Sequence, residues 1–352
     1  MSLNKQSFSN LKEQNKHKHK ASNERLKYKY RIKPKRGDKH DEKTIKAIFE
    51  SIRDFELITD FADLKTFNDE IADKYINKLQ EYDLSLSYLD RNLRYLKAFL
   101  HWLDNKGLVK LDFDHIEYLT MSRNERSTAK APLYQKSYTI NQIIKAINLM
   151  PEKTLIDIRN KAMVSLQALC GLRVSELKAI KIRNLIKDEY RKTYFIDINP
   201  KDVGVKNAKK REAYFMPFFP KRLIENVLKW RDYLLSKGFK KTDPLFPKIP
   251  NHFNQLNLLE TNLSFESIKS SSAMKSIFET AFKRAEYEYI KIHNFRHTIA
   301  RFAYYKKDFK FFHRVSLSLG HKGIETTLNS YVGVQDYGEG LSSDDEDDFA
   351  IW

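Results

Sequence analysis

The chain has 352 residues, enough for two domains of ordinary size. Hydrophobic residues make up 41% of it, so its domains can bury real cores, and a wholly disordered protein is excluded. Lysine and arginine number 64 against 46 aspartate and glutamate residues, and the resulting net charge of +18 predicts a polyanionic partner, either nucleic acid or an anionic membrane surface.

The sequence shows no membrane span, secretion signal or cofactor motif. No stretch approaches the roughly 18 apolar residues that a membrane span needs, and the N-terminus has no apolar core of a signal peptide. The single cysteine, Cys170, excludes an intramolecular disulfide and a CxxC metal site, and suits an inert core thiol. Without clustered His and Cys, an EF-hand or a Walker-type loop, we expect no metal and no other cofactor. We therefore expect a cytoplasmic protein that binds nucleic acid and no membrane.

Residues 1–40 carry thirteen Lys and Arg against three Asp and Glu, with almost no apolar periodicity. This composition predicts a flexible basic arm that contacts phosphates without sequence preference. A solubilising tail is the alternative.

Residues 41–120 are predicted to form a small helical domain of about four helices. In its clearest helix, leucines recur every three or four residues on one stripe, at Leu86, Leu89, Leu93, Leu96, Leu100 and Leu103. Ser87 with Asp90 resembles a helix start, and Gly107 suits the helix end. The opposite face offers Arg91, Arg94 and Lys97, which indicate either a DNA-facing surface or a solvated one.

Residues 121–138 have linker composition and mark a domain boundary. A second domain then spans 139–333. It is predicted to contain strands at 194–198 and 212–218, joined by a lysine-rich connection as a hairpin, and helices at 139–150 (capped by Thr139), 157–170, 174–180, 220–237, 271–289, 293–305, 308–318 and 323–331. The tail, 334–352, holds five consecutive acids and ends in an apolar segment. It suits either docking on another protomer or disorder.

Three short segments of the second domain stand out: GLRVSEL at 171–177, HNFRH at 293–297 and LGHKGIETTLNSY at 319–331. Each alone is ordinary, since Arg173 could lie on the surface and His293 with Arg296 could pair with any carboxylate. Their order and spacing along the chain are what make the three segments indicative of a shared site. A Gly-Leu-Arg with Glu three residues later is followed by His-x-x-Arg, then Gly-His, then a tyrosine ten residues after that histidine.

With these motifs the chain resembles the tyrosine recombinase (phage integrase) family over about 45–333, most strongly at 159–180 and 290–331. The resemblance implies a mainly α fold with a small antiparallel β-sheet in the catalytic domain. It also implies a two-domain, C-shaped DNA clamp, in which 41–120 is the helical core-binding domain and 139–333 is the tyrosine recombinase catalytic domain.

The resemblance also implies a catalytic set. Arg173 and Arg296 would grip the scissile phosphate, which suits the planar, always charged guanidinium. His293 and His321 would donate to phosphate oxygens or manage the nucleophile's proton. Tyr331 would attack the phosphorus, form a covalent 3′-phosphotyrosine and free a 5′-hydroxyl, without metal or ATP.

Glu176, one turn after Arg173, would support the cluster. The family's hairpin lysine protonates the leaving 5′-oxygen, and Lys201 best matches that position. Its neighbours are predicted to contact DNA: Lys206, Lys209, Lys210 and Arg211.

Two features depart from the commonest family pattern. The spacing from His321 to Tyr331 is ten rather than nine, and Val-Gly-Val follows the tyrosine. Tyr337 is therefore a minor competitor as nucleophile, whereas Tyr304 and Tyr305 are interpreted as packing residues.

The implied function is site-specific recombination of duplex DNA: integration, excision or dimer resolution. The implied partner is double-stranded DNA with a specific, inverted-repeat site, on two copies of which the protein would assemble as a tetramer. A non-enzymatic DNA-binding protein and a type IB topoisomerase or telomere resolvase remain alternatives. Within recombinases, both a mobile-element integrase and a Xer-like dimer resolvase stay open, and the basic N-terminal segment favours the former.

Overall fold

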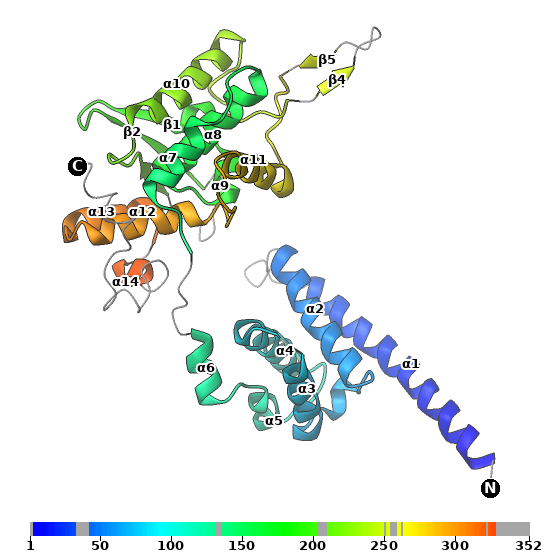
Figure 1. The fold of residues 1–352 in the computed structure, drawn as a ribbon. Coiled ribbons are helices and arrows are strands. Elements are labelled where there is room, and N and C mark those ends of the chain that lie inside the picture. The colour runs from blue at the N-terminus through cyan, green and yellow to red at the C-terminus, as the bar shows by residue number, and fades with distance from the viewer. Residues whose placement is uncertain are drawn as a thin grey trace. The chain divides into compact units, whose positions relative to one another are not determined.

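The computed structural model describes residues 3–32, 42–82, 84–130, 136–200, 202, 210–249, 251–253, 259–261, 263–321 and 323–328. The chain divides into two compact units, Met1–Ala131 and Pro132–Trp352. The described residues of the first unit are helical, and those of the second add a small antiparallel sheet to a mainly helical body (Figure 1). The predicted fold class, mainly α with a small antiparallel sheet, is confirmed.

The first unit packs its helices around one apolar core. The helices are α1 (Leu3–Ile32), α2 (Glu42–Ile58), α3 (Asp69–Glu81), α4 (Leu86–Asn105), α5 (Phe113–Tyr118) and α6 (Arg123–Lys130), with a 3₁₀ turn, η2, at Leu64–Thr66. The predicted leucine stripe of α4 is buried from Leu89 to Leu103. The predicted start is wrong, because Ser85, not Ser87, is the cap: its hydroxyl accepts the Tyr88 N–H at 3.3 Å.

The flexible arm predicted for residues 1–40 is a helix over its described part. Tyr30 is 3% exposed and makes edge-on ring contacts with Phe99 and Trp102 at 5.2 and 5.0 Å between centroids. The Lys27 ammonium contacts the buried Glu56 carboxylate at 2.7 Å. Leu26 and Tyr30 lie four apart on one helical face, and this face, together with Lys27, docks α1 on the core of the first unit.

This docking gives a stability prediction. Tyr30→Ala should lower the free energy of unfolding of the first unit by about 3–5 kcal/mol, the cost of truncating a buried aromatic side chain to alanine. Tyr28→Ala, two residues earlier on the same helix at a side chain that is 66% exposed, should change it by less than about 0.5 kcal/mol. Urea titration measures both, and equal midpoints for the two variants would contradict the docked helix.

The segment 121–138, predicted as linker, also holds a helix, α6. A reciprocal cap starts it: the Glu125 N–H donates to Ser122 Oγ at 3.2 Å, and the Ser122 N–H donates to the Glu125 carboxylate at 2.9 Å. This Ser-x-x-Glu signature is visible in the sequence, but apolar periodicity, the signal used to predict helices there, is absent because the helix is short and polar. Residues 131–135 lie outside the described part of the chain.

The second unit is built around α8 (Leu155–Cys170), whose residues are buried from Lys161 to Cys170. It is surrounded by α7 (Ile140–Asn148), α10 (Lys221–Ser236), α12 (Asn294–Tyr305) and the sheet (Figure 1). A helix apolar on most of its circumference has to be buried, and α8 places the Gly171 turn inside the unit. Cys170 is fully buried, as predicted.

The sheet has the order β1-β2-β3 and is antiparallel throughout. Its strands are β1 (Leu185–Asp188), β2 (Thr193–Ile198) and β3 (Arg211–Tyr214), and the predicted hairpin is β2–β3. Ile196 lies between Leu185 and Ala213 in the register, and these three side chains face the core. Strand β1 and the hairpin of β4 (Asn251–Phe253) with β5 (Leu259–Thr261) were not predicted.

The remaining elements are α9 (Val174–Ala179), a 3₁₀ turn η3 (Ile182–Asn184), α11 (Ser271–Arg284), α13 (Phe309–Leu319) and α14 (Ile324–Thr327). Thr139 caps α7 in a reciprocal box with Gln142, as predicted. Helix α11 ends five residues before the predicted 289, because Glu286 adopts a left-handed conformation with φ 64°. The tail, 334–352, lies outside the described residues.

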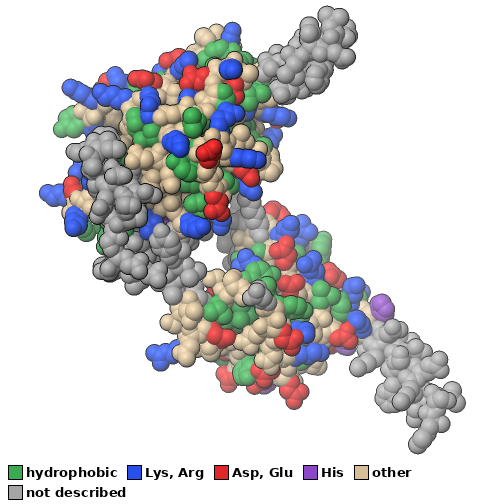
Figure 2. Space-filling model, viewed as in Figure 1, with side chains coloured by type: hydrophobic (Ala, Val, Ile, Leu, Met, Phe, Trp, Pro, Cys, Tyr) green, Lys and Arg blue, Asp and Glu red, His purple; other side chains and the backbone are tan. Residues whose placement is uncertain are grey.

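Basic side chains are spread over the surface of each unit, with acidic ones among them, on the face that Figure 2 shows. The excess of positive charge is therefore distributed rather than gathered in one visible patch. Within the described residues, no helix is both long and apolar enough to cross a membrane.

Candidate active site

Three arginines from different elements converge on the C-terminal end of α13. Three consecutive carbonyls there each accept from one of them: Ser318 O from Arg211, Leu319 O from Arg296 at 2.7 Å, and Gly320 O from Arg173 at 3.3 Å. Arg173 precedes α9, Arg211 begins β3, and Arg296 lies in the first turn of α12. The carbonyl end of a helix attracts cations, so this end gathers the guanidinium groups at one place.

Glu176 joins two of these arginines. Its carboxylate is fully buried and contacts Arg173 Nη1 at 3.0 Å through one oxygen and Arg211 Nη2 at 2.5 Å through the other. It also accepts the Arg173 backbone N–H at 2.7 Å. Burial opposes ionisation, but the charges of Arg211, Arg173 and Arg296 and this backbone hydrogen bond outweigh it and hold the pKa of Glu176 below its usual value.

Arg211 was predicted to contact DNA, but the structure places it inside this cluster. Its side chain is 9% exposed, and burial, with the like charges of Arg296 and Arg173, lowers its pKa to about 10 against the attraction of Glu176. The sequence gives no sign of this position, because Arg211 ends the basic run KNAKKR and resembles its exposed neighbours.

Two glycines make the convergence possible. Gly320 ends α13 in the left-handed region with φ 78°, and a Cβ there would lie 2.6 Å from the Arg211 side chain. Gly171 ends α8 with φ 54°, and a Cβ there would lie 3.0–3.2 Å from Ile299, Leu319 and Arg296. The Gly171 carbonyl accepts from Arg296 Nη1 at 2.6 Å. Because these two glycines have no Cβ, the Arg296 side chain can pack against residue 171 and the Arg211 side chain against residue 320.

His321 follows Gly320 and is 9% exposed. Arg296 Nη2 lies 3.2 Å from its Nε2, and Thr327 Oγ1 lies 2.6 Å from its Nδ1. Burial first, and then the positive charges of Arg296, Arg173 and Arg211, lower the pKa of His321 to about 3. The imidazole is therefore neutral at pH 7.

His293 and His297 lie one turn apart at the start of α12, with ring centroids 5.4 Å apart. His293 is solvent-exposed, whereas His297 is 2% exposed. Partial desolvation and the charges of Arg296 and Arg173 lower the pKa of His293 to about 4, and burial next to His293 and Arg296 lowers that of His297 to about 3. The second motif thus offers one solvent-facing neutral imidazole beside Arg296.

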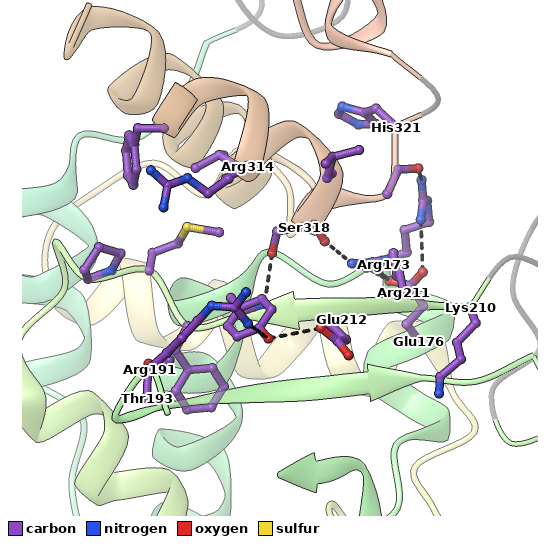
Figure 3. Close-up of a pocket in the computed structure, with 18 residues that line it drawn as sticks. Arg173, Glu176, Arg191, Thr193, Lys210, Arg211, Glu212, Arg314, Ser318 and His321 are labelled. Atoms are coloured by element: carbon purple, nitrogen blue, oxygen red, sulfur yellow. Dashed lines mark hydrogen bonds and ion pairs between the residues drawn. The ribbon is translucent and has the colours of Figure 1, made fainter. Parts of the chain in front are cut away.

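A cavity of about 890 Å³ opens beside the cluster. Figure 3 shows Arg173, Glu176 and Arg211 on one side of it near His321, with Arg191 and Thr193 on the other side. Arg173 is 29% exposed, whereas Arg296 is fully buried. In this structure Arg173 is therefore the guanidinium of the predicted pair that a ligand in the cavity can reach.

The other predicted site residues fall into two groups. Lys210 lines the cavity with its side chain 65% exposed, 3.8 Å from Asp197. Tyr304 packs its ring on Phe312 with 5.7 Å between centroids, in keeping with a packing role. The rest lie outside the described residues: Lys201, Lys206, Lys209, Tyr331 and Tyr337.

The basic face predicted on α4 is partly neutralised within its own unit. Arg94 pairs with Asp90 at 2.8 Å, and Lys97 contacts Glu117 at 3.1 Å. The Arg91 guanidinium lies 4.5 Å from the centre of the Tyr88 ring. A DNA phosphate would have to compete with the two carboxylates.

The buried position of Arg211 gives a second stability prediction. Arg211→Met should destabilise the second unit by about 3–5 kcal/mol, because it breaks a buried ion pair and leaves Glu176 with one arginine fewer. Lys210→Met, at the exposed neighbour, should cost less than about 0.5 kcal/mol. Urea unfolding of both variants measures the difference, and an Arg211→Met protein as stable as the parent would place Arg211 outside the cluster.

Comparison with known proteins supports the family resemblance over the second unit. A sequence model of the phage integrase family matches residues 136–337, more than half of the chain. Tyrosine recombinase XerC of Lactobacillus delbrueckii subsp. bulgaricus is 33% identical over 102 residues, so the match covers 29% of this chain and only 32% of that relative. XerC of Lactobacillus leichmannii is 27% identical over 255 residues, 72% of this chain and 74% of that protein.

Solved structures share the fold. A λ integrase(75–356) dimer bound to a COC′ core site has a TM-score of 0.59 at 13% identity, covering 92% of this chain and 97% of that one. XerH recombinase bound to a palindromic difH substrate, in a post-cleavage complex, has a TM-score of 0.59 at 17% identity, covering 83% and 77%. At these identities the likeness shows a common architecture.

Proposed function

This chain belongs to the phage integrase family, and from that premise we propose that it is a site-specific DNA recombinase that cuts and rejoins duplex DNA through a covalent 3′-phosphotyrosine. The proposal extends to a cytoplasmic enzyme that needs neither metal nor ATP. Within it, 139–333 is the catalytic domain and 41–120, together with α1, is the helical DNA-binding domain. The C-shaped closure implied by the resemblance remains a prediction.

The observation that supports this proposal most is the cluster at the end of α13. It brings together Arg173, Glu176, Arg296 and His321, which come from three separate motifs. Helix α14 begins shortly after this histidine, and Tyr331 follows the last described residue, 328, by a few positions. A packing role alone does not require three guanidinium groups and a neutral imidazole beside a cavity open to a ligand.

The proposed roles follow from the chemistry of each group. Arg173 binds the scissile phosphate directly, and Arg296 gives up a carbonyl bond for the stronger charge-assisted bond to a phosphate oxygen. His293 donates to the phosphate from the solvent side. Tyr331 attacks the phosphorus while Lys201 protonates the leaving 5′-oxygen. Glu176 positions Arg173 and balances its charge.

The proposed partner is double-stranded DNA with an inverted-repeat site, bound by a tetramer that holds two sites. A solved λ integrase tetramer is described as bound to a Holliday junction, which supports this assembly by analogy of fold. The charge of +18 supplies nonspecific affinity for the backbone. Lys210 and the other lysines of the β2–β3 connection are proposed backbone contacts. The proposal leaves open whether the sites belong to a mobile element or to replicon dimers.

Covalent trapping tests the proposal. The full-length protein is incubated with nicked duplexes from which a short cleaved strand diffuses away, so that the covalent complex cannot reverse. A denaturant-resistant protein–DNA band, formed in EDTA and without ATP, is the expected result, together with joining of two different duplexes on intact sites. A complete lack of adduct would favour a non-enzymatic DNA-binding protein, and an adduct without joining would favour a topoisomerase-like enzyme.

A further inference from the structure

The Glu176 carboxylate is shared between two arginines rather than held by one. Its Oε1 accepts from Arg173 Nη1 at 3.0 Å, whereas its Oε2 accepts from Arg211 Nη2 at 2.5 Å and from the Arg173 backbone N–H at 2.7 Å. The other terminal nitrogen of Arg173, Nη2, makes a longer contact of 3.3 Å with Gly320 O. Ordinary N–H···O bonds measure about 2.7–3.2 Å, so this donor is weakly held.

A single side-chain bond between an arginine and a carboxylate leaves part of their complementarity unused. The planar guanidinium and the two carboxylate oxygens match each other, and such pairs favour two parallel hydrogen bonds. Arg173 and Glu176 lie three residues apart at the start of α9, close enough to form that arrangement. The oxygen that the second bond would need is the one to which Arg211 donates.

The Arg211 side chain is fixed by the sheet and by the end of α13. Arg211 is the first residue of β3 and pairs in the register with the buried Ile198 of β2. Its Nη1 donates to Ser318 O, and a Cβ on Gly320 would lie 2.6 Å from its Cδ and Nε, so the backbone there packs directly against it. A side chain held in this way can act as a stationary donor to the carboxylate.

We propose that Arg211 is a positioning residue: by occupying one oxygen of Glu176, it limits the carboxylate to a single side-chain bond with Arg173 and leaves Arg173 Nη2 to a phosphate oxygen in the cavity. That this phosphate belongs to DNA rests on the proposed function. The sequence assigned Arg211 to the DNA backbone together with the lysines before it. The structure places it one carboxylate away from the guanidinium that lines the cavity.

This sharing has a direct consequence for phosphate binding. With Arg211 in place, Arg173 keeps Nη1 on Glu176 and exchanges the 3.3 Å carbonyl contact of Nη2 for a charge-assisted bond to phosphate. Without Arg211, both nitrogens can close on the carboxylate, and a phosphate must first break one of those bonds. Since one hydrogen bond to a charged group changes an equilibrium by about tenfold or more, phosphate affinity should fall by that factor.

Phosphate binding can be measured without any DNA reaction. Inorganic phosphate is titrated into the full-length protein labelled with ¹⁵N-arginine, in which the Arg173 side-chain signals are assigned by their loss in Arg173→Lys. Arg211→Met should weaken phosphate binding by about tenfold or more. Arg314→Met, which removes an exposed positive charge from the lining of the same cavity, should weaken it by less than about threefold, because exposed charges are screened.

The spectra without phosphate report the geometry itself. In the parent, rotation about the Cζ–Nη2 bond of Arg173 should average the two Nη2 protons, because that nitrogen is weakly held. In Arg211→Met, both nitrogens are held by Glu176, so rotation should slow and the Nη2 protons should become distinct. The loss of a positive charge alone would not slow this rotation.

A double substitution separates positioning from damage to the fold. Arg211→Met combined with Glu176→Gln removes both members of the buried ion pair, so no unpaired carboxylate is left to close on Arg173 or to destabilise the second unit. The double variant should recover most of the phosphate affinity that Arg211→Met loses, although it lacks more of the native contacts. If damage to the fold were the cause, the second substitution would give no recovery.

Single-turnover cleavage of the nicked duplex supplies the kinetic test. Arg211→Met should slow cleavage by about tenfold or more with DNA affinity close to that of the parent, and the double variant should cleave faster than Arg211→Met. Parental phosphate binding by a folded Arg211→Met protein would overturn the proposal, as would a double variant that binds phosphate no better. If Arg211→Met does not fold, loss of phosphate binding in the double variant overturns it. If the parent forms no adduct on any DNA, the proposed function fails, whereas the phosphate titration and the spectra still decide the role of Arg211.

Discussion

Arg173→Ala is expected to slow DNA cleavage by about 10²-fold or more, the scale seen when one preorganised donor to transition-state charge is removed. Negative charge builds up on the non-bridging oxygens as the phosphorus becomes five-coordinate, and Arg173, unlike Arg296, lines the cavity. Its side chain is 29% exposed and Glu176 keeps its contact with Arg211, so truncation should cost less stability than Arg211→Met and leave DNA affinity close to that of the parent. The measurement is the single-turnover rate on the nicked duplex.

Arg296→Ala should slow cleavage at least as much, but it should also cost stability. Arg296 is fully buried, and its removal leaves the Gly171 and Leu319 carbonyls without this donor. The Lys variants separate the two effects, since lysine keeps the charge but cannot make two parallel hydrogen bonds to one phosphate. Arg173→Lys and Arg296→Lys should fold, bind DNA and still cleave slowly. Wild-type cleavage by either would contradict the proposed clamp.

The arginine cluster stabilises the fold, and in the proposed function the same guanidinium groups also bind the phosphate. The end of α13 presents three carbonyls, and the guanidinium groups satisfy them in the protein without DNA. A phosphate is a better acceptor than a carbonyl because it is charged. In the proposed function, a bound phosphate would therefore exchange weaker internal hydrogen bonds of these arginines for stronger ones.

The sequence was sufficient where a local signal specifies the structure. Thr139 and Gln142 form the box that begins α7, the leucine stripe is the buried face of α4, and Gly107 adopts the left-handed conformation expected after a helix. The motif residues Arg173, Glu176, Arg296 and His321 were selected by their order and spacing, and the structure places them in contact.

The rest depends on contacts between distant segments. Arg211 is buried because Glu176 and the end of α13 meet it, and neither lies near it in the sequence. Helix α1 docks because Tyr30 meets Phe99 in the core and Lys27 meets the buried Glu56. Periodicity and composition carry no information about such distant partners. They therefore predicted a DNA contact for Arg211 and a flexible arm for residues 1–40.

Tyr331→Phe should abolish the covalent protein–DNA adduct. The substitution removes one oxygen and leaves the ring, so stability, charge and DNA affinity should barely change. A phenol with a pKa near 10 is a weak nucleophile at neutral pH, and in the proposed function the positive charges of the arginine cluster favour its phenolate. Without the oxygen no phosphotyrosyl bond can form, and the loss should be complete rather than partial.

The matched control is Tyr337→Phe, at the competing tyrosine further along the chain. It should leave the adduct intact, because the spacing of ten residues from His321 to Tyr331 lies close to the family's usual nine, whereas Tyr337 follows His321 by 16 residues. Peptide mapping of the parent adduct should place the linkage in the segment that contains Tyr331. The denaturing gel should show one shifted band for the parent and for the Tyr337→Phe protein, and none for the Tyr331→Phe protein. An adduct that survives Tyr331→Phe would assign the attack to another tyrosine, with Tyr337 the first to examine by the double substitution.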